Sequence, residues 1–126
     1  MDDWRYLLSL GANVLLEGGD RVIDQVIAVM TPHLRHPIQT CPHWPPQAMP
    51  SEGALILRDT ATLNADEQRS LLHWLDNAGA QIQVIAAASS PLFPLVLEGR
   101  FLHSLYYRLN ILYITGADAL SIGNVG

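Results

Sequence analysis

Short apolar runs that alternate with segments of helical periodicity constrain the fold of this chain more than any other feature. The apolar runs are Val14–Leu16, Ala54–Leu57, Ile82–Ala88 and Ile111–Ile114. After the first run, apolar residues recur at helical spacing from Val22 to Met30, and the same spacing returns after the second run, in residues 64–78. Buried strands that alternate with amphipathic helices are typical of βαβ units, which build a mostly parallel sheet covered by helices on both faces. The sequence therefore predicts an α/β domain.

Turn residues and prolines set the expected boundaries of these elements. Asn64 can cap the second helix, with Glu67 three residues further on to complete a capping box, and Gly79 is expected to end it. Six of the eight prolines fall in residues 32–50, a segment that cannot form a regular helix or a central strand. Only Pro37–Cys41 is expected to pair within it, at an edge of the sheet.

Composition narrows the class of protein. The 126 residues suit a single domain spanning 1–126, and the net charge of −5 disfavours direct binding to nucleic acid. The single cysteine excludes an internal disulfide framework and suits a reducing compartment. The N-terminus begins with two acids instead of the positive charge of a signal peptide, and no apolar stretch reaches the roughly 18 residues of a membrane span. We therefore expect a cytoplasmic protein that does not contact membranes.

The polar clusters give no catalytic set. His33, His36, Cys41 and His43 lie within eleven residues, but their spacing fits no common zinc finger, so no metal site is expected. The lone cysteine and scattered serines define no nucleophile with a base and an orienting group. Trp74 lies beside the leucine face of its helix, which leaves a place in the core and a place at an interface equally open. For the adjacent tyrosines Tyr106 and Tyr107, we expect at most one to reach solvent.

Residues 53–114 resemble the second half of the AAA+ domain of bacterial sigma-54-dependent transcription activators, which are hexameric ATPases. The resemblance rests on the strand that follows Gly53, on "VIAA" at residues 84–87, on Gly99-Arg100-Phe101 and on "LYYRLN" at residues 105–110. It implies a three-layer, P-loop NTPase-like core with a parallel sheet of about five strands. "NVLLEG" at residues 13–18 stands where that family has its first strand and the start of its phosphate loop.

The positions that would bind ATP and magnesium depart from the family pattern. A phosphate loop needs a lysine for the β and γ phosphates, but the segment after Gly18 and Gly19 contains none, and an ungapped alignment places Asp24 at the lysine position. The Asp-Glu pair that holds magnesium is replaced by Arg58 and Asp59. Asp59 is expected to be a solvated turn residue that pairs with Arg58. The resemblance therefore implies no bound cofactor at this site.

The resemblance also implies roles for three further positions, those of a polar sensor and of two arginines. The family's polar sensor, Thr-Asn after the fourth strand, becomes Ala88-Ser89, and Ser89 has the shorter reach. Of the two family arginines that act on a neighbouring subunit's ATP, the first falls at Leu102 and the second at Arg108. Arg108, together with Arg100, is therefore a candidate for a subunit interface. The alternative for Arg108 is a structural arginine that pairs with a carboxylate or caps a helix end.

Two family elements are missing from the sequence. The loop that contacts sigma-54 would lie between Cys41 and Gly53, where only a short proline-rich segment stands. The helical lid would follow the fifth strand, and we expect the fold to lack it. Two functions remain open beside that of a remnant without a role. One is a non-catalytic regulatory domain that associates with a sigma-54-dependent activator or with itself, and the other is a residual ATP-binding or weak ATPase domain.

Overall fold

A five-stranded parallel sheet organises the computed structural model, which describes residues 3–116. The strands are β1 Val14–Glu17, β2 Ile38–Cys41, β3 Ala54–Leu57, β4 Gln83–Ala88 and β5 Leu112–Ile114. Their order across the sheet is β2-β3-β4-β1-β5, and every neighbouring pair is parallel. The expected parallel sheet of about five strands is confirmed, as is the edge position of the strand that ends at Cys41.

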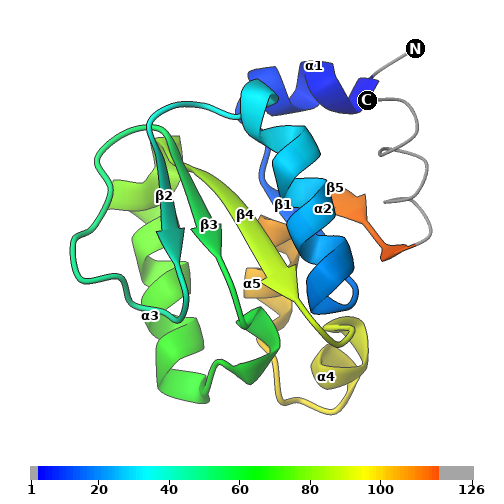
Figure 1. Ribbon diagram of the computed structural model, residues 1–126. Helices are drawn as coiled ribbons and strands as arrows, with labels where there is room; N and C mark the ends of the chain where they lie inside the picture. The colour runs from blue at the N-terminus through cyan, green and yellow to red at the C-terminus, as the bar shows by residue number, and fades with distance from the viewer. Residues whose placement is uncertain (1–2, 117–126) are drawn as a thin grey trace.

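Helices cover both faces of the sheet. They are α1 Asp3–Ser9, α2 Asp20–Met30, α3 Ala65–Asp76, α4 Phe93–Leu97 and α5 His103–Leu109. In Figure 1, α2 crosses the near face of the sheet, whereas α3 and α5 lie behind it. The three-layer arrangement is therefore confirmed. The position expected for a helical lid, after β5, falls in residues 117–126, which lie outside the described residues.

The alternation of side chains along the strands produces two apolar cores. Leu15, Leu55 and Val84 belong to the core under α3 and α5. Their chain neighbours Leu16 and Ile56 belong to the core under α1 and α2. Because successive side chains of a strand point to opposite faces, a strand that is apolar at every position is buried on both sides. No helix within residues 3–116 is long and apolar enough to cross a membrane.

The expected capping box of α3 is confirmed. Asn64 Oδ1 accepts the Glu67 backbone N–H at 2.8 Å, and Glu67 Oε1 accepts the Asn64 N–H at 2.8 Å. The far end of α3 differs from expectation, because the helix ends at Asp76 and Gly79 lies in a following 3-10 turn. A Cβ at Gly79 would lie 2.5 Å from Cδ2 of Trp74. The glycine is therefore required by the packing of the Trp74 ring rather than by the helix end.

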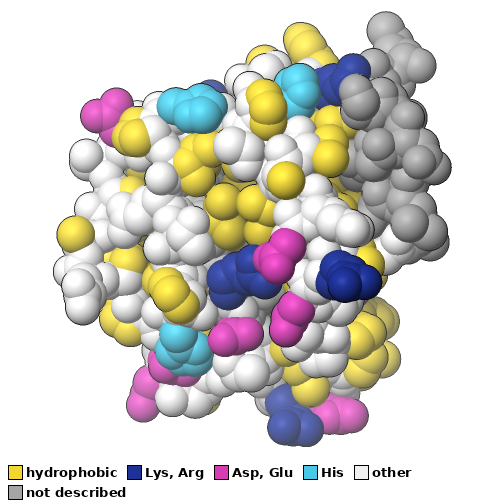
Figure 2. Space-filling view, viewed as in Figure 1, with side chains coloured by type: hydrophobic (Ala, Val, Ile, Leu, Met, Phe, Trp, Pro, Cys, Tyr) yellow, Lys and Arg dark blue, Asp and Glu magenta, His cyan; other side chains and the backbone are white. Residues whose placement is uncertain are grey.

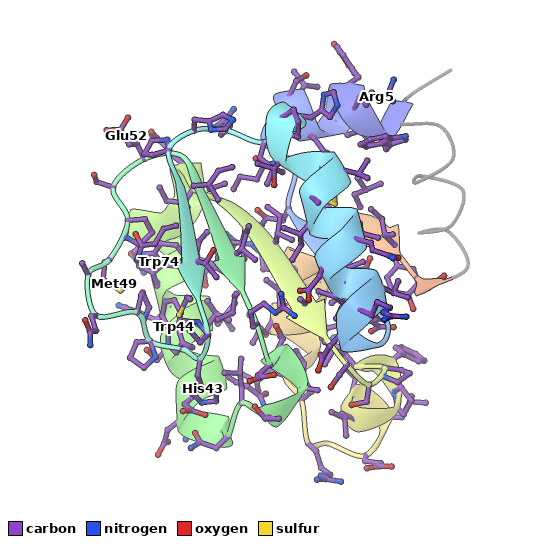
Figure 3. All side chains as sticks on the ribbon, in the orientation of Figure 1. Arg5, His43, Trp44, Met49, Glu52 and Trp74 are labelled. Atoms are coloured by element: carbon purple, nitrogen blue, oxygen red, sulfur yellow. The ribbon has the colours of Figure 1, made fainter. Side chains whose placement is uncertain are left out.

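The proline-rich segment folds back over α3. Trp44 is only 2% exposed, its ring centroid lies 5.4 Å from that of Trp74, and its Nε1–H donates to Ser70 Oγ at 3.1 Å. Figure 3 shows Trp44 and Trp74 side by side between the segment and α3. Trp74 is therefore a core residue, which decides between the two alternatives left open by the sequence. The segment also runs beside the edge strand β2, and Gln39 Nε2 donates to the Ala48 carbonyl at 2.7 Å.

A buried glutamine fixes the loop between α4 and α5. Gln68, on α3, is 2% exposed, and its Nε2 donates to the carbonyls of Leu63 and Arg100 at 2.9 and 3.0 Å. Its Oε1 accepts the backbone N–H of Leu102 at 2.8 Å. Since buried polar groups are costly unless they are hydrogen-bonded, this side chain ties the loop to α3 at two points, Arg100 and Leu102.

Candidate functional site

The turn after β1 is too short to form a phosphate loop. Strand β1 ends at Glu17 and α2 begins at Asp20, so that only Gly18 and Gly19 separate them. The Gly18 N–H donates to the Ala88 carbonyl at 3.1 Å, which ties the turn to the end of β4. In a P-loop, several consecutive backbone amides outside the helix surround the phosphates. The residues aligned with the rest of that loop are here the first turns of α2.

Asp24 and Arg58 form an ion pair at the carboxyl end of the sheet. Asp24 is on α2 and Arg58 directly follows β3, and Arg58 Nη1 lies 2.7 Å from Asp24 Oδ1. Figure 2, which views the molecule from the side of α2, shows a basic side chain beside acidic ones near the centre of the view. The sequence-based expectation that Arg58 pairs with Asp59 is wrong. The positions aligned with the phosphate-binding lysine and the magnesium-binding acid instead carry exchanged charges that neutralise each other.

Asp59 and Ser89 are exposed at the ends of β3 and β4. Asp59 has left-handed backbone angles (φ 55°, ψ 37°), and its carbonyl accepts the N–H and the hydroxyl of Thr62 at 3.0 and 2.8 Å. The expectation that Asp59 is a solvated turn residue is confirmed. Ser89 lies in the bend after β4. Neither side chain has a hydrogen-bond partner within residues 3–116.

Glu17 is a buried carboxylate at the end of β1 that sequence reasoning missed. It is 6% exposed, its Oε1 accepts the Tyr113 hydroxyl at 2.5 Å, and its Oε2 accepts the Leu92 N–H at 2.9 Å. Burial, and then the negative charge of Glu17, raise the pKa of the Tyr106 hydroxyl. The one sequence signal for this buried carboxylate is an acidic residue at the last position of an otherwise apolar strand.

The two candidate interface arginines have different surroundings. Arg108 pairs with Asp76, and its Nη2 donates to the Leu75 carbonyl at 2.8 Å, at the last turn of α3. These contacts are those of the alternative stated above, a structural arginine at a helix end. Arg100 is exposed and lies 3.4 Å from Glu98. Leu102, at the first of the family's trans-acting positions, is held by Gln68 through its backbone.

The described histidines and the cysteine in and beside the proline-rich region do not gather at one site. His33 packs edge-on against Trp4 with a ring-centroid distance of 5.5 Å, whereas the Cys41 thiol donates to the His43 carbonyl at 3.1 Å. Burial raises the pKa of the Cys41 thiol. Among residues 3–116, no group of three or more potential ligands is placed to hold a metal ion. Of the two tyrosines, Tyr106 is 8% exposed and Tyr107 53%, as expected.

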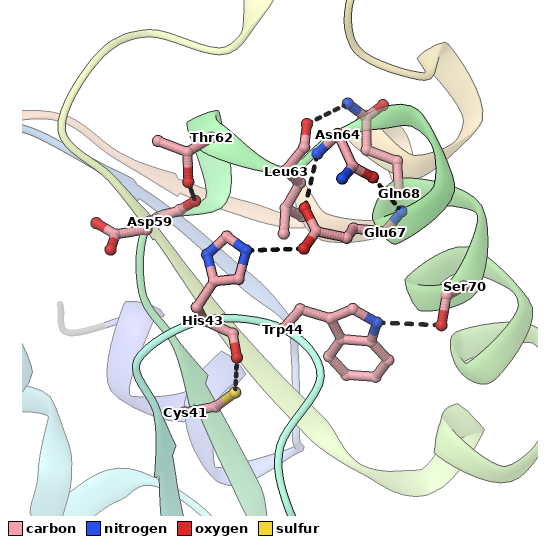
Figure 4. A network of polar contacts seen from close by, with 10 residues as sticks. All are labelled: Cys41, His43, Trp44, Asp59, Thr62, Leu63, Asn64, Glu67, Gln68 and Ser70. Atoms are coloured by element: carbon pink, nitrogen blue, oxygen red, sulfur yellow. Dashed lines mark hydrogen bonds and ion pairs between the residues drawn. The ribbon is translucent and has the colours of Figure 1, made fainter.

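His43 connects the proline-rich segment to the capping box of α3. Its Nε2 lies 2.9 Å from Glu67 Oε2, and Figure 4 shows this pair beside the Trp44–Ser70 hydrogen bond. The hydrogen bond from the Asn64 N–H and then that with His43 lower the pKa of Glu67, burial opposes them more weakly, and the charge of His43 makes the smallest contribution, a further lowering. The ionised form of Glu67 is therefore the form that the fold favours.

We expect this capping box to make stability depend on pH. Because the folded-state pKa of Glu67 is lowered, its contribution is present above the unfolded-state value of about 4.3 and is lost as pH falls through the folded-state value. Glu67→Gln keeps a capping side chain but cannot titrate. Urea unfolding at pH 5, 4 and 3 should show a steeper loss of stability in the unsubstituted protein than in this variant. Glu98→Gln is the control, and equal slopes for the protein and the Glu67 variant would contradict the prediction.

Comparison with solved structures shows which kind of fold the domain has. The crystal structure of NtrX from Brucella abortus in complex with ATP superposes with a TM-score of 0.65 at 14% sequence identity, over 88% of this chain and 34% of that one. The same protein in complex with ADP gives a TM-score of 0.64 at 14% identity, over 90% and 35%. At this identity the likeness concerns the fold alone. The domain therefore has a three-layer α/β fold of the AAA+, P-loop NTPase type.

Sequence comparison then gives the family. The profile of the sigma-54 interaction domain matches residues 26–115, most of the chain, and the chain belongs to this family. The regulatory protein HrpR of the pathogenicity locus of Pseudomonas syringae pv. syringae is 37% identical over 71 residues. That match covers 48% of this chain and 23% of HrpR. The chain thus spans about a quarter to a third of the length of these relatives.

Proposed function

We propose that this chain is a non-catalytic regulatory domain of the sigma-54 activator family that acts by associating with another protein. The observation that carries the proposal is the Asp24–Arg58 ion pair. ATP hydrolysis on this fold uses a lysine at the phosphates and an acid at the magnesium ion. With the charges exchanged, Asp24 repels phosphate and Arg58 repels the metal. A nucleotide would also have to compete with the pair itself.

The surroundings of the pair support the same conclusion. The two-residue turn of Gly18 and Gly19 has too few backbone amides to surround phosphates, and the buried Glu17 carboxylate lies at the end of β1. A helix N-terminus attracts anions, which is the argument for residual ATP binding, but Asp20 occupies the first turn of α2. Together these carboxylates oppose an anionic ligand. We therefore favour association over nucleotide binding.

Exposed apolar side chains on α4 and α5 are the surface that we assign to this association. Phe93, Leu97 and Tyr107 are 44%, 73% and 53% exposed, and the Phe93 ring packs 5.7 Å from that of Tyr106. Apolar side chains gathered in this way on a small domain are typical of a protein interface. The partner that we propose is a second copy of the chain or a sigma-54-dependent activator. The family membership supports such a partner, and a cytoplasmic location is part of the proposal.

Isothermal titration with ATP and magnesium, run beside mass measurement by light scattering, tests the proposal. We expect no saturable heat at millimolar ATP and a mass above the 13.9 kDa of one chain. The Brucella abortus NtrX domain, whose structure contains ATP, is the positive control. Micromolar binding would overturn the argument from the ion pair and favour a residual ATPase. A monomer without nucleotide binding would overturn self-association, and titration of the domain with a purified sigma-54-dependent activator would then decide the second form of the proposal.

The assigned surface can be tested separately from the ATP site. Leu97→Ser should reduce the mass to that of a monomer without loss of folding, because the side chain is 73% exposed and supports little of the core. Met49→Ser, in the proline-rich segment, removes an apolar side chain of 46% exposure from another face and should leave the mass unchanged. If both variants keep the assembly intact, α4 is not the contact.

A further inference from the structure

A hollow of about 610 Å³ lies at the amino ends of the strands, at the opposite edge of the sheet from the Asp24–Arg58 pair. Its walls come from the turn before β1, the end of the proline-rich segment, the turn before β4 and the turn before β5. Leu10 and Ile111 line it, and they are 55% and 61% exposed. Pockets that hold small ligands or short peptide segments are typically about 300 to 1,000 Å³. The hollow thus has the size of a binding site, with two exposed apolar side chains in a mostly polar lining.

Arg35 is positioned in this hollow by the backbone around it. Its Nη2 donates to the Leu10 carbonyl at 2.9 Å, and its Nη1 lies 3.5 Å from the Gln81 carbonyl. A Cβ at Gly11 would lie 2.5 Å from the Arg35 Cζ, and Gly11 has a φ of +88°. The positive φ favours glycine at this turn, and the absence of a side chain there leaves room for the guanidinium. The two carbonyl contacts hold the cation in the hollow.

Arg35 has no acidic partner among residues 3–116. Its polar contacts there are to carbonyl oxygens and, through its own N–H, to the side chain of Gln83. Most other arginines with described contacts pair with carboxylates, including Arg58 and Arg108. Glu52, at the end of the proline-rich segment, also lines the hollow and lies outside ion-pair distance of Arg35. A guanidinium that keeps unused N–H donors beside exposed apolar side chains fits a carboxylate next to an apolar group.

We propose that this hollow binds a protein segment in which an aliphatic side chain stands next to a carboxylate. The aliphatic side chain lies between Leu10 and Ile111, and the carboxylate pairs with the Arg35 guanidinium. Glu52 limits the affinity, because its charge repels that of the segment. This inference does not rest on the proposed function, since the hollow and the closed ATP site lie at opposite ends of the strands.

Titration of the ¹⁵N-labelled chain with the peptide acetyl-Glu-Leu-Leu-Glu-amide, followed by amide chemical shifts, tests the inference. Saturable shifts are expected at Gly11, Gly53 and Ile111. The peptides with Lys or Gln in place of Glu are the controls and should bind more weakly. Shifts of equal size with the Lys peptide, shifts elsewhere, or no shifts would overturn the inference. The same shifts with inorganic phosphate alone would also overturn it, because they would indicate a simple anion site.

Two substitutions with opposite expected effects on peptide affinity keep the test decisive even if one variant does not fold. Arg35→Gln should weaken binding of the acidic peptide about three- to fivefold, as for the loss of an exposed ion pair. Glu52→Gln should strengthen it about twofold, an effect that a merely structural role of Arg35 does not produce. If Arg35→Gln does not fold, Glu52→Gln and the peptide controls decide the result. Unchanged affinity in Glu52→Gln would contradict the proposed geometry.

Discussion

Gly53→Ala is expected to destabilise the domain by about 3 kcal/mol or more, which is a large fraction of the stability of a typical small domain. Gly53 has a φ of +85°, and a Cβ there would lie 2.8 Å from the Pro37 nitrogen, 2.9 Å from its carbonyl carbon and closer still to its oxygen. The same stretch of backbone also helps to pair β2 with β3, because the Pro37 carbonyl accepts the Ala54 N–H at 3.0 Å. The new methyl group therefore cannot be accommodated without separating β2 from β3.

A matched glycine separates the effect of packing from that of the backbone angle. Gly99 has a φ of +74°, but a Cβ there would meet nothing within 4 Å. Gly99→Ala should therefore cost only the left-handed backbone penalty of about 1 to 2 kcal/mol. Urea unfolding followed by circular dichroism measures both variants. If the two lose equal stability, the close approach of Gly53 to Pro37 is not what limits this position.

Trp44→Ala should cost about 3 to 5 kcal/mol, as for other large buried aromatic side chains. The ring is 2% exposed, packs against Trp74 and donates a hydrogen bond to Ser70. Its loss leaves a cavity between the proline-rich segment and α3, and also leaves the Ser70 hydroxyl without this partner. The midpoint of thermal unfolding and the fluorescence of Trp74 report the change.

Gln47→Ala, an exposed position in the same segment, is the control for Trp44→Ala and should change stability by less than about 0.5 kcal/mol. A small effect of Trp44→Ala, similar to that of the control, would mean that the proline-rich segment does not contribute to the core. Trp44→Phe keeps most of the ring volume but loses the indole N–H, and its cost should lie between the two.

Sequence patterns predicted the features that depend on nearby residues. Strand runs, helical spacing and the Asn64–Glu67 capping box are set by residues within a few positions of one another, and the structure confirms each of them. The matched motifs of a known family added the three-layer arrangement. Gly79 was assigned to a helix end, because its contact with Trp74 depends on how the chain folds after the helix.

Features that depend on distant parts of the chain were not predictable in the same way. The high proline content excluded regular structure between residues 42 and 50, but it gave no sign that Trp44 turns inward onto α3. Arg58 was assigned to its neighbour Asp59. The structure pairs it with Asp24, which is 34 positions away. Successive residues at the end of a strand point in opposite directions, so adjacency along the chain is poor evidence for an ion pair there.

Two of the hydrogen bonds of Gln68 have a mechanical consequence. They join α3 to the loop between α4 and α5, at Arg100 and Leu102, so this loop cannot move as a hinge unless both bonds break. A displacement of this loop is then transmitted to α3 through the Gln68 side chain, in addition to the apolar packing between them. Amide hydrogen exchange in α3 would therefore report events on the opposite side of that loop, at residues that a bound protein never touches.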